Sequence, residues 1–452
     1  MSGTQDATVG MKDWIAGTGA PLSGRIRVPG DKSVSHRAIM LASLANGVSR
    51  IDGFLEGEDT RATAAVFQQL GVKIEAPSPQ SRIVHGVGLR GLRASAQALD
   101  CGNAGTGMRL LAGVLAGQAF DSTLIGDASL SKRPMRRVID PLAKMGAQID
   151  SEDGGLPPLR IRGGRTLQGI DYTLPVASAQ VKSALLLAGL YAEGETVVRE
   201  PHPTRDYTER MLSAFGWPIE FEPGVARVRG GAGNAHALRA TDVHVPADFS
   251  SAAFFLVAAS VIPGSDLTLD AVGMNPRRTG LLEALRLMGA DIEETNARRA
   301  GGEAVADLRV RHAPLCGIDV PEHLVPDMID EFPALFVAAA CADGVTRVRG
   351  AAELRVKESD RLATMSAGLR QLGIRVDEAA DGADIHPGAF SPAADGGTRI
   401  DSHGDHRIAM SFAIAAQRCA QPFVIGDIAN VATSFPGFDT LARGVGFALR
   451  DR

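Results

Sequence analysis

The sequence predicts an α/β protein built from six repeats, three in each half of the chain. The first observation is a run at residues 29–47 that is polar and cationic at its start and almost entirely small and apolar beyond it. A helix that is apolar on every side, and too short to span a membrane, is a buried helix. The second observation is that five further segments repeat this order. The third is that each is followed by a strand-like run and an amphipathic helix.

The polar starts predict binding sites for anions. They are residues 31–37, 103–109, 177–182, 247–251, 327–331 and 404–407. Ser, Asp and Asn are common N-cap residues, and the backbone N–H groups of a helix N-terminus carry partial positive charge. An N-terminus of this kind with Lys or Arg beside it attracts an anion.

Each amphipathic helix ends close to a glycine, which is typical of a helix C-terminus. These closing glycines are Gly71, Gly146, Gly216, Gly289, Gly373 and Gly444. Their period of roughly 70 to 85 residues is longer than that of the usual solenoid repeat.

In chain order, the first twelve or so residues predict a disordered tail, and residues 14–28 predict a strand because LSGRIRV alternates apolar and polar side chains. The repeats then cover residues 30–74, 100–149, 172–219, 243–292, 320–376 and 401–452. Residues 77–97 and 222–240 predict polar hairpins and loops. With a boundary near residue 243, three buried helices in each half would direct their N-termini to one end. Two such ends would face each other across an anion-attracting cleft.

Composition excludes several classes of protein. A hydrophobic content of 45% and a charged content of 22% are ordinary for a globular protein, and 452 residues suffice for two domains. A net charge of −5 does not indicate the basic surface that nucleic-acid binding requires. Four widely spaced cysteines without a CxxC pair indicate reduced thiols, and the chain shows neither a signal peptide nor a membrane-spanning run. We expect a cytoplasmic protein that binds neither nucleic acid nor membranes.

Basic residues gather at or just after the polar starts. They are Lys32, Arg37, Arg109, Lys132, Arg133, Arg205, Lys357, Arg361 and Arg407. An arginine fork suits bidentate contacts with carboxylate or phosphate, whereas lysine is a movable point charge. Any one of them could be a solvated surface charge, but their coincidence with helix N-termini indicates anionic ligands.

Two carboxylates, Asp330 and Glu358, are candidates for acid–base catalysis because neighbouring cations and burial can shift a pKa. The alternatives, an N-cap for Asp330 and a surface salt bridge between Glu358 and Arg361, are equally open. His406 is best interpreted as a helix N-terminal residue rather than part of a catalytic dyad. No cluster has metal-ligand spacing, and NAGTGMR is neither a Walker loop nor a dinucleotide fingerprint.

The motifs GDKSVSHRA, GNAGTGMR, KRPM, ASAQVKSA, ELRVKESDR and DHRIAMS resemble the 3-phosphoshikimate 1-carboxyvinyltransferase (EPSP synthase) family. They occur in order and cover the chain past about residue 20. The residues in several of these motifs, and the segment TSFP at Thr433, resemble those of the bacterial branch that includes glyphosate-tolerant members. The resemblance implies two inside-out α/β barrel domains with the active site in the cleft between them. One domain would comprise residues 1–30 plus 244–452, and the other residues 31–243.

The resemblance also implies the reaction: the enolpyruvyl group of phosphoenolpyruvate passes to the 5-hydroxyl of shikimate 3-phosphate, by addition to a tetrahedral ketal phosphate and loss of phosphate. The implied protein is a monomer without metal or cofactor, in aromatic amino acid biosynthesis. The residues implied for shikimate 3-phosphate are Lys32, Ser33, Arg37, Ser178, Ala179, Gln180, Arg205, Asp330 and Lys357. Those implied for phosphoenolpyruvate are Lys32, Gly105, Arg133, Gln180, Arg361 and Arg407. Asp330 would be the base on the 5-hydroxyl, Glu358 the acid toward the methylene, and Lys32 a third catalytic residue.

The chain departs from the family pattern at two places. Many relatives carry Lys before TFP where this chain has Thr433 and Ser434, which puts one phosphoenolpyruvate contact in doubt. Many carry Pro where this chain has Leu110.

Three alternatives remain: the UDP-N-acetylglucosamine enolpyruvyltransferases, which use a loop cysteine; the RNA 3′-phosphate cyclase type; and a non-catalytic anion-binding protein. Cys101 lies in the approach to the second polar start, not in an obvious Gly/Pro loop.

Overall fold

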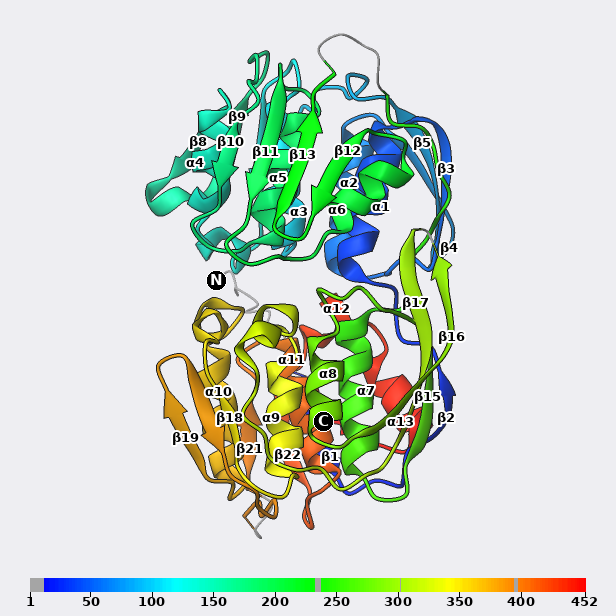
Figure 1. Cartoon of the computed structure of the whole chain (residues 1–452), viewed down its shortest axis with the longest axis vertical. Helices are drawn as coiled ribbons and strands as arrows, with labels where there is room; N and C mark the ends of the chain where they lie inside the picture. Colours follow the sequence, from blue (N-terminus) through cyan, green and yellow to red (C-terminus); the bar gives the residue numbers. More distant parts are fainter. Residues whose placement is uncertain (1–11, 232–236, 301, 394–396) are drawn as a thin grey trace, which may run out of the picture.

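The computed structural model describes residues 12–231, 237–300, 302–393 and 397–452. It is a mixed α/β fold drawn out into two lobes (Figure 1). Each lobe has its own apolar core, formed by buried residues between 34 and 245 in the first lobe and by residues 14–28 and 247–449 in the second. The predicted tail at residues 1–11 and part of the predicted loop, residues 232–236, lie outside the described residues.

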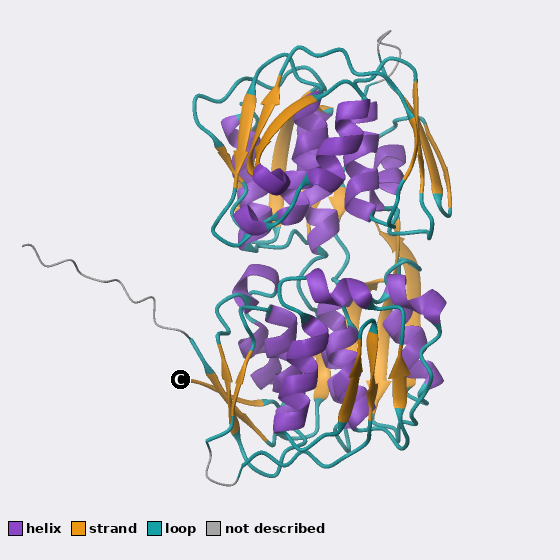
Figure 2. Ribbon diagram, turned by 90° about the vertical axis from the view of Figure 1, so that its left-hand side faces the viewer, coloured by secondary structure: helices purple, strands orange, loops and turns teal. Residues whose placement is uncertain are grey.

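Helices fill the interior of each lobe and strands lie outside them, as Figure 2 shows. Three helices in the described part of each lobe are buried. In the first lobe they are α1 (Lys32–Leu44), α3 (Gly105–Ala116) and α5 (Ala179–Gly189). In the second they are α7 (Phe249–Val261), α9 (Phe332–Ala340) and α11 (His406–Ala416). Nearly every residue of these helices is buried beyond the first turn, which confirms the predicted six buried helices.

The amphipathic helices pack around these central helices. They are α2 (Glu58–Gln69), α4 (Arg136–Lys144), α6 (Tyr207–Ala214), α8 (Gly280–Leu287), α10 (Arg361–Gln371) and α13 (Phe438–Val445). Five of the predicted closing glycines follow a helix with φ between 78° and 98°, a conformation that favours glycine after a C-cap. The prediction for Gly444 is wrong: it lies inside α13, and Gly446, with a φ of 124°, ends the helix.

The connections contain shorter helical turns. They are η1 (Leu130–Lys132), η2 (Asp153–Gly155), η3 (Glu322–Asp327), η4 (Ala352–Val356) and the short helix α12 (Val431–Ser434).

Within the described residues, six sheets form the outer layer, and five share one order: a parallel pair at one edge, continued by two antiparallel strands. The first sheet of the first lobe has the strand order β14 (Val243–His244), β3 (Asn46–Asp52), β5 (Ser81–Val87), β4 (Lys73–Ser78). The second has the order β6 (Leu99–Asp100), β7 (Ser122–Ile125), β9 (Leu156–Arg162), β8 (Gln148–Glu152). The third has the order β10 (Asp171–Thr173), β11 (Glu195–Arg199), β13 (Val225–Arg229), β12 (Ile219–Glu222). Their parallel pairs are β14 with β3, β6 with β7, and β10 with β11. The repeat predicted from the sequence is therefore also a repeat of sheet topology.

The sheets of the second lobe follow the same plan. One has the strand order β2 (Ser23–Ile26), β15 (Asp266–Gly273), β17 (Glu303–Arg311), β16 (Asp291–Ala300). Another has the order β21 (Arg399–Asp401), β22 (Phe423–Gly426), β1 (Trp14–Gly17), β23 (Ala448–Asp451). The last has the order β18 (Thr346–Val348), β20 (Gly382–Ile385), β19 (Val376–Ala379). In the last of these the parallel edge is reduced to single bridges at Cys316 and Asp319. The single strand predicted at residues 14–28 is instead two strands in different sheets, β1 between β22 and β23, and β2 beside β15.

The chain passes between the lobes twice, and the two crossing segments pair with each other. Gly30 and Ala247 form an antiparallel bridge. The amide of Asp31 donates to the carbonyl of Pro246 at 2.8 Å, and the amide of Asp248 donates to the carbonyl of Pro29 at the same distance. Each segment leads directly into a buried helix, α1 or α7. The crossing therefore fixes where these two helices begin.

The contact between α3 and α5 yields a stability prediction. A Cβ atom on Gly113 would lie 2.2 Å from the carbonyl oxygen of Ala184, a backbone atom that cannot move alone. We expect Gly113→Ala to destabilise the protein by about 1–3 kcal/mol, because the two helices must separate.

Gly444 is the matched control, since it is exposed in α13 with open space around its Cα. Gly444→Ala should be neutral or stabilising by about 0.5–1 kcal/mol. Urea unfolding of both variants checks this, and equal effects at the two positions would contradict the close packing of α3 and α5.

Candidate functional site

The N-termini of α3 and α5 gather three polar groups in the first lobe. A Cβ on Gly105 would lie 3.1 Å from Nη1 of Arg109 and 3.3 Å from Nη1 of Arg133, so both guanidinium groups converge on this helix start. Arg109 Nη1 donates to Oε1 of Gln180 at 2.8 Å, which ties α3 to α5. Arg133 Nη2 donates to Oδ1 of Asn103 at 2.8 Å. The local charge is positive, and the hydrogen-bond acceptors of these guanidinium groups are neutral: the amides of Gln180 and Asn103 and the hydroxyl of Ser129.

The N-terminus of α1 carries Lys32, whose ammonium group bridges the lobes. Its Nζ donates to Oδ2 of Asp59 in α2 at 3.1 Å and to Oγ of Ser434 in α12 at 2.8 Å. At the place where the sequence departs from the family pattern, Ser434 faces Lys32, while the Thr433 hydroxyl donates to the carbonyl of Asn430 at 2.7 Å. Leu110, the other departure, is fully buried in α3.

Arg37, one turn further along α1, is turned into the first lobe. It is only 3% exposed, and its guanidinium donates to Thr208 at 2.7 Å, Ser183 at 2.8 Å and the carbonyl of Ser33 at 2.9 Å. Burial lowers the pKa of Arg37 to about 10, so it stays charged at neutral pH. Ser178 is the N-cap of α5, with Ala179 as the first residue of that helix.

Arg205 lies in the connection between β11 and α6 and reaches across to the second lobe. Its Nη2 donates to Oδ2 of Asp330 at 2.8 Å. The backbone of this connection is held by a buried ion triad, because Lys182 contacts Glu200 and Glu209 at 2.8 Å each, with all three side chains at most 4% exposed. Glu200 in turn accepts the amide of Thr204 at 3.2 Å.

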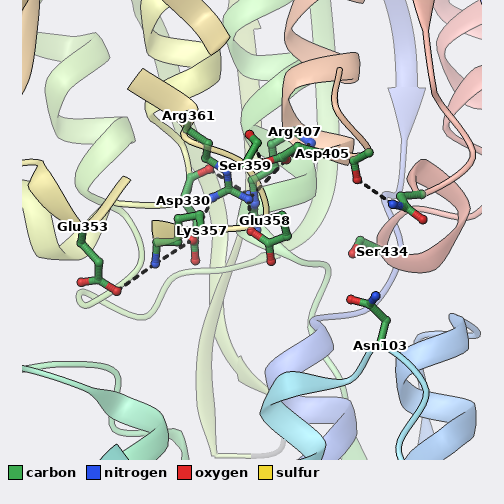
Figure 3. Close-up of polar contacts among 12 residues, drawn as sticks. Asn103, Asp330, Glu353, Lys357, Glu358, Ser359, Arg361, Asp405, Arg407 and Ser434 are labelled. Carbon is green, nitrogen blue, oxygen red and sulfur yellow. Dashed lines mark hydrogen bonds and ion pairs between the residues drawn. The ribbon is translucent and has the colours of Figure 1, made fainter. Parts of the chain in front are cut away.

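Asp330 lies among cations from both lobes, of which Lys357, Arg361 and Arg407 are drawn in Figure 3. Arg205 Nη2 lies 2.8 Å, Arg361 Nη1 3.4 Å, Lys357 Nζ 3.6 Å and Arg278 Nη1 3.7 Å from its carboxylate oxygens. Arg407 Nη1 donates to its backbone carbonyl at 3.0 Å. Asp330 is not the N-cap of α9, because Glu331 holds that position, so the simpler alternative from the sequence is wrong.

Glu358 and Arg361 form the salt bridge that the sequence allowed, but it is not an ordinary surface pair. Arg361 Nη2 donates to Oε2 of Glu358 at 2.7 Å, and the arginine side chain is only 1% exposed against 33% for the glutamate. The other side of the guanidinium contacts buried Asp405, with Nε 2.8 Å from Oδ2. Asp405 also accepts the amide of Arg407 at 2.9 Å as the N-cap of α11, so one carboxylate positions two arginines.

Both candidate catalytic carboxylates are held in their charged form. Burial alone would raise the pKa of Asp330, but the surrounding cations, Lys357 and Arg407 foremost, hold it well below its usual range. Partial loss of water contact would likewise raise the pKa of Glu358, yet the charge of Arg361 lowers it. Burial lowers the pKa of His406, the first residue of α11, to about 3, so its imidazole is neutral.

The structure brings the predicted residues of the second lobe into one cluster, Asp330 with Lys357, Arg361 and Arg407, and joins it to the first lobe through Arg205. Gln180, Gly105 and Arg133 gather around the N-terminus of α3, and the charges of Arg133 and Arg109 act on Glu358, the partner of Arg361 in that cluster. Sequence reasoning did not find Arg278, Asp405 or Asn103 as site residues. Arg278 is 4% exposed and immediately precedes the N-cap of α8, an amphipathic helix rather than one of the buried helices whose polar starts predicted anion sites.

Among the described residues, no group of three or more His, Cys, Asp or Glu side chains is placed to hold a metal ion. No helix in the described part of the chain is long and apolar enough to cross a membrane.

Comparison with known proteins gives consistent matches along the chain. The family model described as EPSP synthase (3-phosphoshikimate 1-carboxyvinyltransferase) matches residues 17–441. A 3-phosphoshikimate 1-carboxyvinyltransferase of Xanthomonas campestris pv. campestris (strain B100) is 70% identical over 439 residues, covering 97% of this chain and 98% of the relative. One of Xanthomonas axonopodis pv. citri (strain 306) is 70% identical over 436 residues, covering 96% and 97%.

Solved structures agree. The EPSP synthase of Acinetobacter baumannii superimposes with a TM-score of 0.88 at 50% identity, covering 98% of this chain and 100% of that one. The enolpyruvyl transferase NikO of Streptomyces tendae has a TM-score of 0.79 at 18% identity, covering 98% and 99%, which shows a shared fold alone.

A buried glutamate beside the site gives a pH prediction. Asp206, at the start of α6, accepts from Asn275 of the second lobe at 2.8 Å, and Asn275 also lies 3.3 Å from Oε2 of Glu303. Glu303 is 2% exposed, and its Oε1 has no hydrogen-bond partner among the described residues. Burial, opposed by the charge of Arg210, raises the pKa of Glu303 to about 7.

Because this pKa is raised in the folded protein, Glu303 costs stability increasingly as pH rises from about 4.5 through 7. We expect Glu303→Gln to be more stable than the unsubstituted protein at pH 8 by about 1–3 kcal/mol, with a much smaller gain near pH 5. Urea unfolding at both pH values measures this, with exposed Glu222→Gln as the control. A gain that does not change with pH would contradict the burial of a titrating Glu303.

Proposed function

The chain belongs to the EPSP synthase (3-phosphoshikimate 1-carboxyvinyltransferase) family, and we propose that the residues gathered between its two lobes carry out the reaction of that family. The reaction transfers the enolpyruvyl group of phosphoenolpyruvate to the 5-hydroxyl of shikimate 3-phosphate, giving 5-enolpyruvylshikimate 3-phosphate and phosphate. The chain is thus a transferase of the shikimate pathway, which supplies aromatic amino acids. The observation that carries the site assignment is Asp330, a carboxylate surrounded by cations from both lobes.

The two substrates are small and highly anionic, which matches the charge of this region. We assign the 3-phosphate of shikimate 3-phosphate to Lys32, Ser33 and Arg205, with the start of α5 beside them. The further contacts to this substrate are assigned to Arg37, Ser178, Ala179, Gln180, Asp330 and Lys357. Phosphoenolpyruvate is assigned to Lys32, Gly105, Arg133, Gln180, Arg361 and Arg407. The convergence of Arg109 and Arg133 on the N-terminus of α3 supports an anion there.

The chemistry requires proton transfers in two steps. In the addition, the oxygen of the 5-hydroxyl forms a bond to C2 of phosphoenolpyruvate while its proton passes to Asp330, and the methylene carbon C3 accepts a proton from Glu358, which takes one up once anionic phosphoenolpyruvate has drawn Arg361 away from it. In the elimination, the ketal phosphate loses phosphate by cleavage of the C–O bond, C3 returns its proton to Glu358, and the proton on Asp330 leaves with the phosphate. Arg361 links the two carboxylates, since it contacts Glu358 at 2.7 Å and Asp330 at 3.4 Å. Lys32, between the lobes, is assigned as the third catalytic residue.

The acceptor is the point on which enolpyruvyl transferases differ. Transferases acting on UDP-N-acetylglucosamine use a loop cysteine, but Cys101 is 1% exposed and burial raises the pKa of its thiol. A buried thiol of raised pKa is a poor nucleophile. This supports shikimate 3-phosphate as the acceptor.

Several finer assignments are also proposals. The two cores support two inside-out α/β barrel domains, residues 1–30 plus 244–452 and residues 31–243, with the active site in the cleft between them. We propose a cytoplasmic monomer that resembles the glyphosate-tolerant bacterial branch. No metal or cofactor is assigned a step.

A phosphate-release assay tests the function directly. With phosphoenolpyruvate present, we expect shikimate 3-phosphate, and not UDP-N-acetylglucosamine, to support turnover. Phosphate release only with the nucleotide sugar would overturn the assignment of the acceptor, and release with neither would overturn the assignment of the activity.

Two conservative substitutions test the catalytic roles. Asp330→Asn and Glu358→Gln should each lower kcat by about 10²-fold or more, because each removes a positioned proton acceptor or donor. Calorimetry should show that shikimate 3-phosphate still binds to both variants. Normal turnover by either variant would leave that carboxylate with only a structural role.

A further inference from the structure

The ion pair between Arg205 and Asp330 lies where the proposed base must meet its substrate. Arg205 belongs to the first lobe and Asp330 to the second, and their 2.8 Å contact uses Oδ2 of the carboxylate. Arg278 Nη1 lies 3.7 Å from the same oxygen, and Lys357 and Arg361 face Oδ1 at 3.6 and 3.4 Å. Both oxygens that could accept a hydroxyl proton therefore already face cations.

Such a carboxylate is a weak general base. A base works best when its pKa lies near the working pH, and each nearby cation moves the pKa of a carboxylate away from that range. The closest of these cations also occupies the space that a hydroxyl would need in order to approach Oδ2 within hydrogen-bond distance. For the reaction to proceed, at least one cation must leave Asp330.

Arg205 is the cation best able to leave. Arg278 is held by Asp248 at 3.1 Å and Arg361 by Asp405 at 2.8 Å, and both arginines are buried. Lys357 is held by a second carboxylate, that of Glu353, at 3.0 Å. The Arg205 side chain is 24% exposed, and its described ion-pair partner is Asp330 alone.

The backbone around Arg205 does not need to move with it. Glu200 accepts the amide of Thr204 at 3.2 Å, and Lys182 donates to the carbonyl of Thr204 at 3.4 Å. Since these contacts anchor the preceding residue, a change of side-chain rotamer suffices to redirect the guanidinium.

We propose that Arg205 masks Asp330 until the 3-phosphate of the substrate draws its guanidinium away. This rests on the proposed function, in which Arg205 holds that phosphate. A phosphate dianion offers three acceptor oxygens and more charge than a carboxylate, so it is the stronger partner for the arginine fork. Arrival of the correct substrate then frees Asp330 Oδ2 for the 5-hydroxyl, and an unphosphorylated shikimate leaves it masked.

A double-mutant cycle on substrate binding tests the mask without relying on turnover. The dissociation constant of shikimate 3-phosphate is measured by calorimetry for the unsubstituted protein, Arg205→Gln, Asp330→Asn and the double variant. When shikimate 3-phosphate binds, the free energy needed to break the ion pair offsets part of the binding free energy that Arg205 contributes through the phosphate. In the Asp330→Asn background there is no ion pair to break, so this offset is absent. We therefore expect Arg205→Gln to weaken binding by at least about threefold more in the Asp330→Asn background than in the native one.

The alternatives give different results. Equal losses in the two backgrounds would mean that the ion pair persists in the complex, and a smaller loss in the Asp330→Asn background would mean that it forms only on binding. Either result overturns the mask. Unphosphorylated shikimate should show no coupling, and Arg205→Lys, which keeps the charge, should retain part of the coupling seen with the phosphorylated substrate.

Arg199→Gln is the matched control, because Arg199 forms a half-exposed ion pair with Asp171 within the first lobe, at 2.9 Å. Its effect should be the same in both backgrounds.

Turnover of shikimate 3-phosphate by the unsubstituted protein distinguishes failure of the mask from failure of the proposed function. Normal turnover with an additive cycle overturns the mask alone, whereas absence of binding and turnover overturns the proposed function with it.

Discussion

Positive charge concentrated between the two lobes is the constraint on which the rest of the site depends. Lys32 and Arg407 lie in the first turns of buried helices, and Arg361 begins α10, so their charges add to the partial charges of helix N-termini. Like charges at this density repel, and each needs a partner. Asp59, Asp405, Glu331 and Asp330 supply carboxylates within 3.6 Å of them. The protein thus holds its cations in place with its own anions.

These internal carboxylates differ in what they can later do. Asp405 is fully buried and caps α11 while it holds Arg361, so it serves as a fixed support. Asp330 and Glu358 are more exposed and each contacts a cation that is also assigned to a substrate. When anionic substrates take those cations, the two carboxylates lose the charges that lower their pKa values. Substrate binding and acid–base chemistry are therefore coupled through the same arginines.

The crossing segments explain how two separate cores can build one site. They pair with each other through Gly30 and Ala247, and they lead straight into α1 and α7. A Cβ on Gly30 would lie 1.9 Å from the carbonyl oxygen of Gly53, so only glycine permits this approach. Asp31, at the end of one crossing, accepts from Tyr207 at 3.1 Å and caps α1. The connection between the lobes is thus continuous with the start of the site.

The sequence alone determined the six buried helices and the repeat, because helix periodicity, capping and closing glycines are local properties. It also identified most basic residues of the site, since they lie at helix starts. It did not reveal that residues 14–28 split between two sheets, because strand pairing there joins residues about 410 positions apart in one sheet and about 240 in the other. Nor did it reveal Arg278 or the pair of Arg205 with Asp330, which are 125 positions apart. Only the packing of one lobe against the other decides which charges meet, and those meetings set the pKa values on which the chemistry depends.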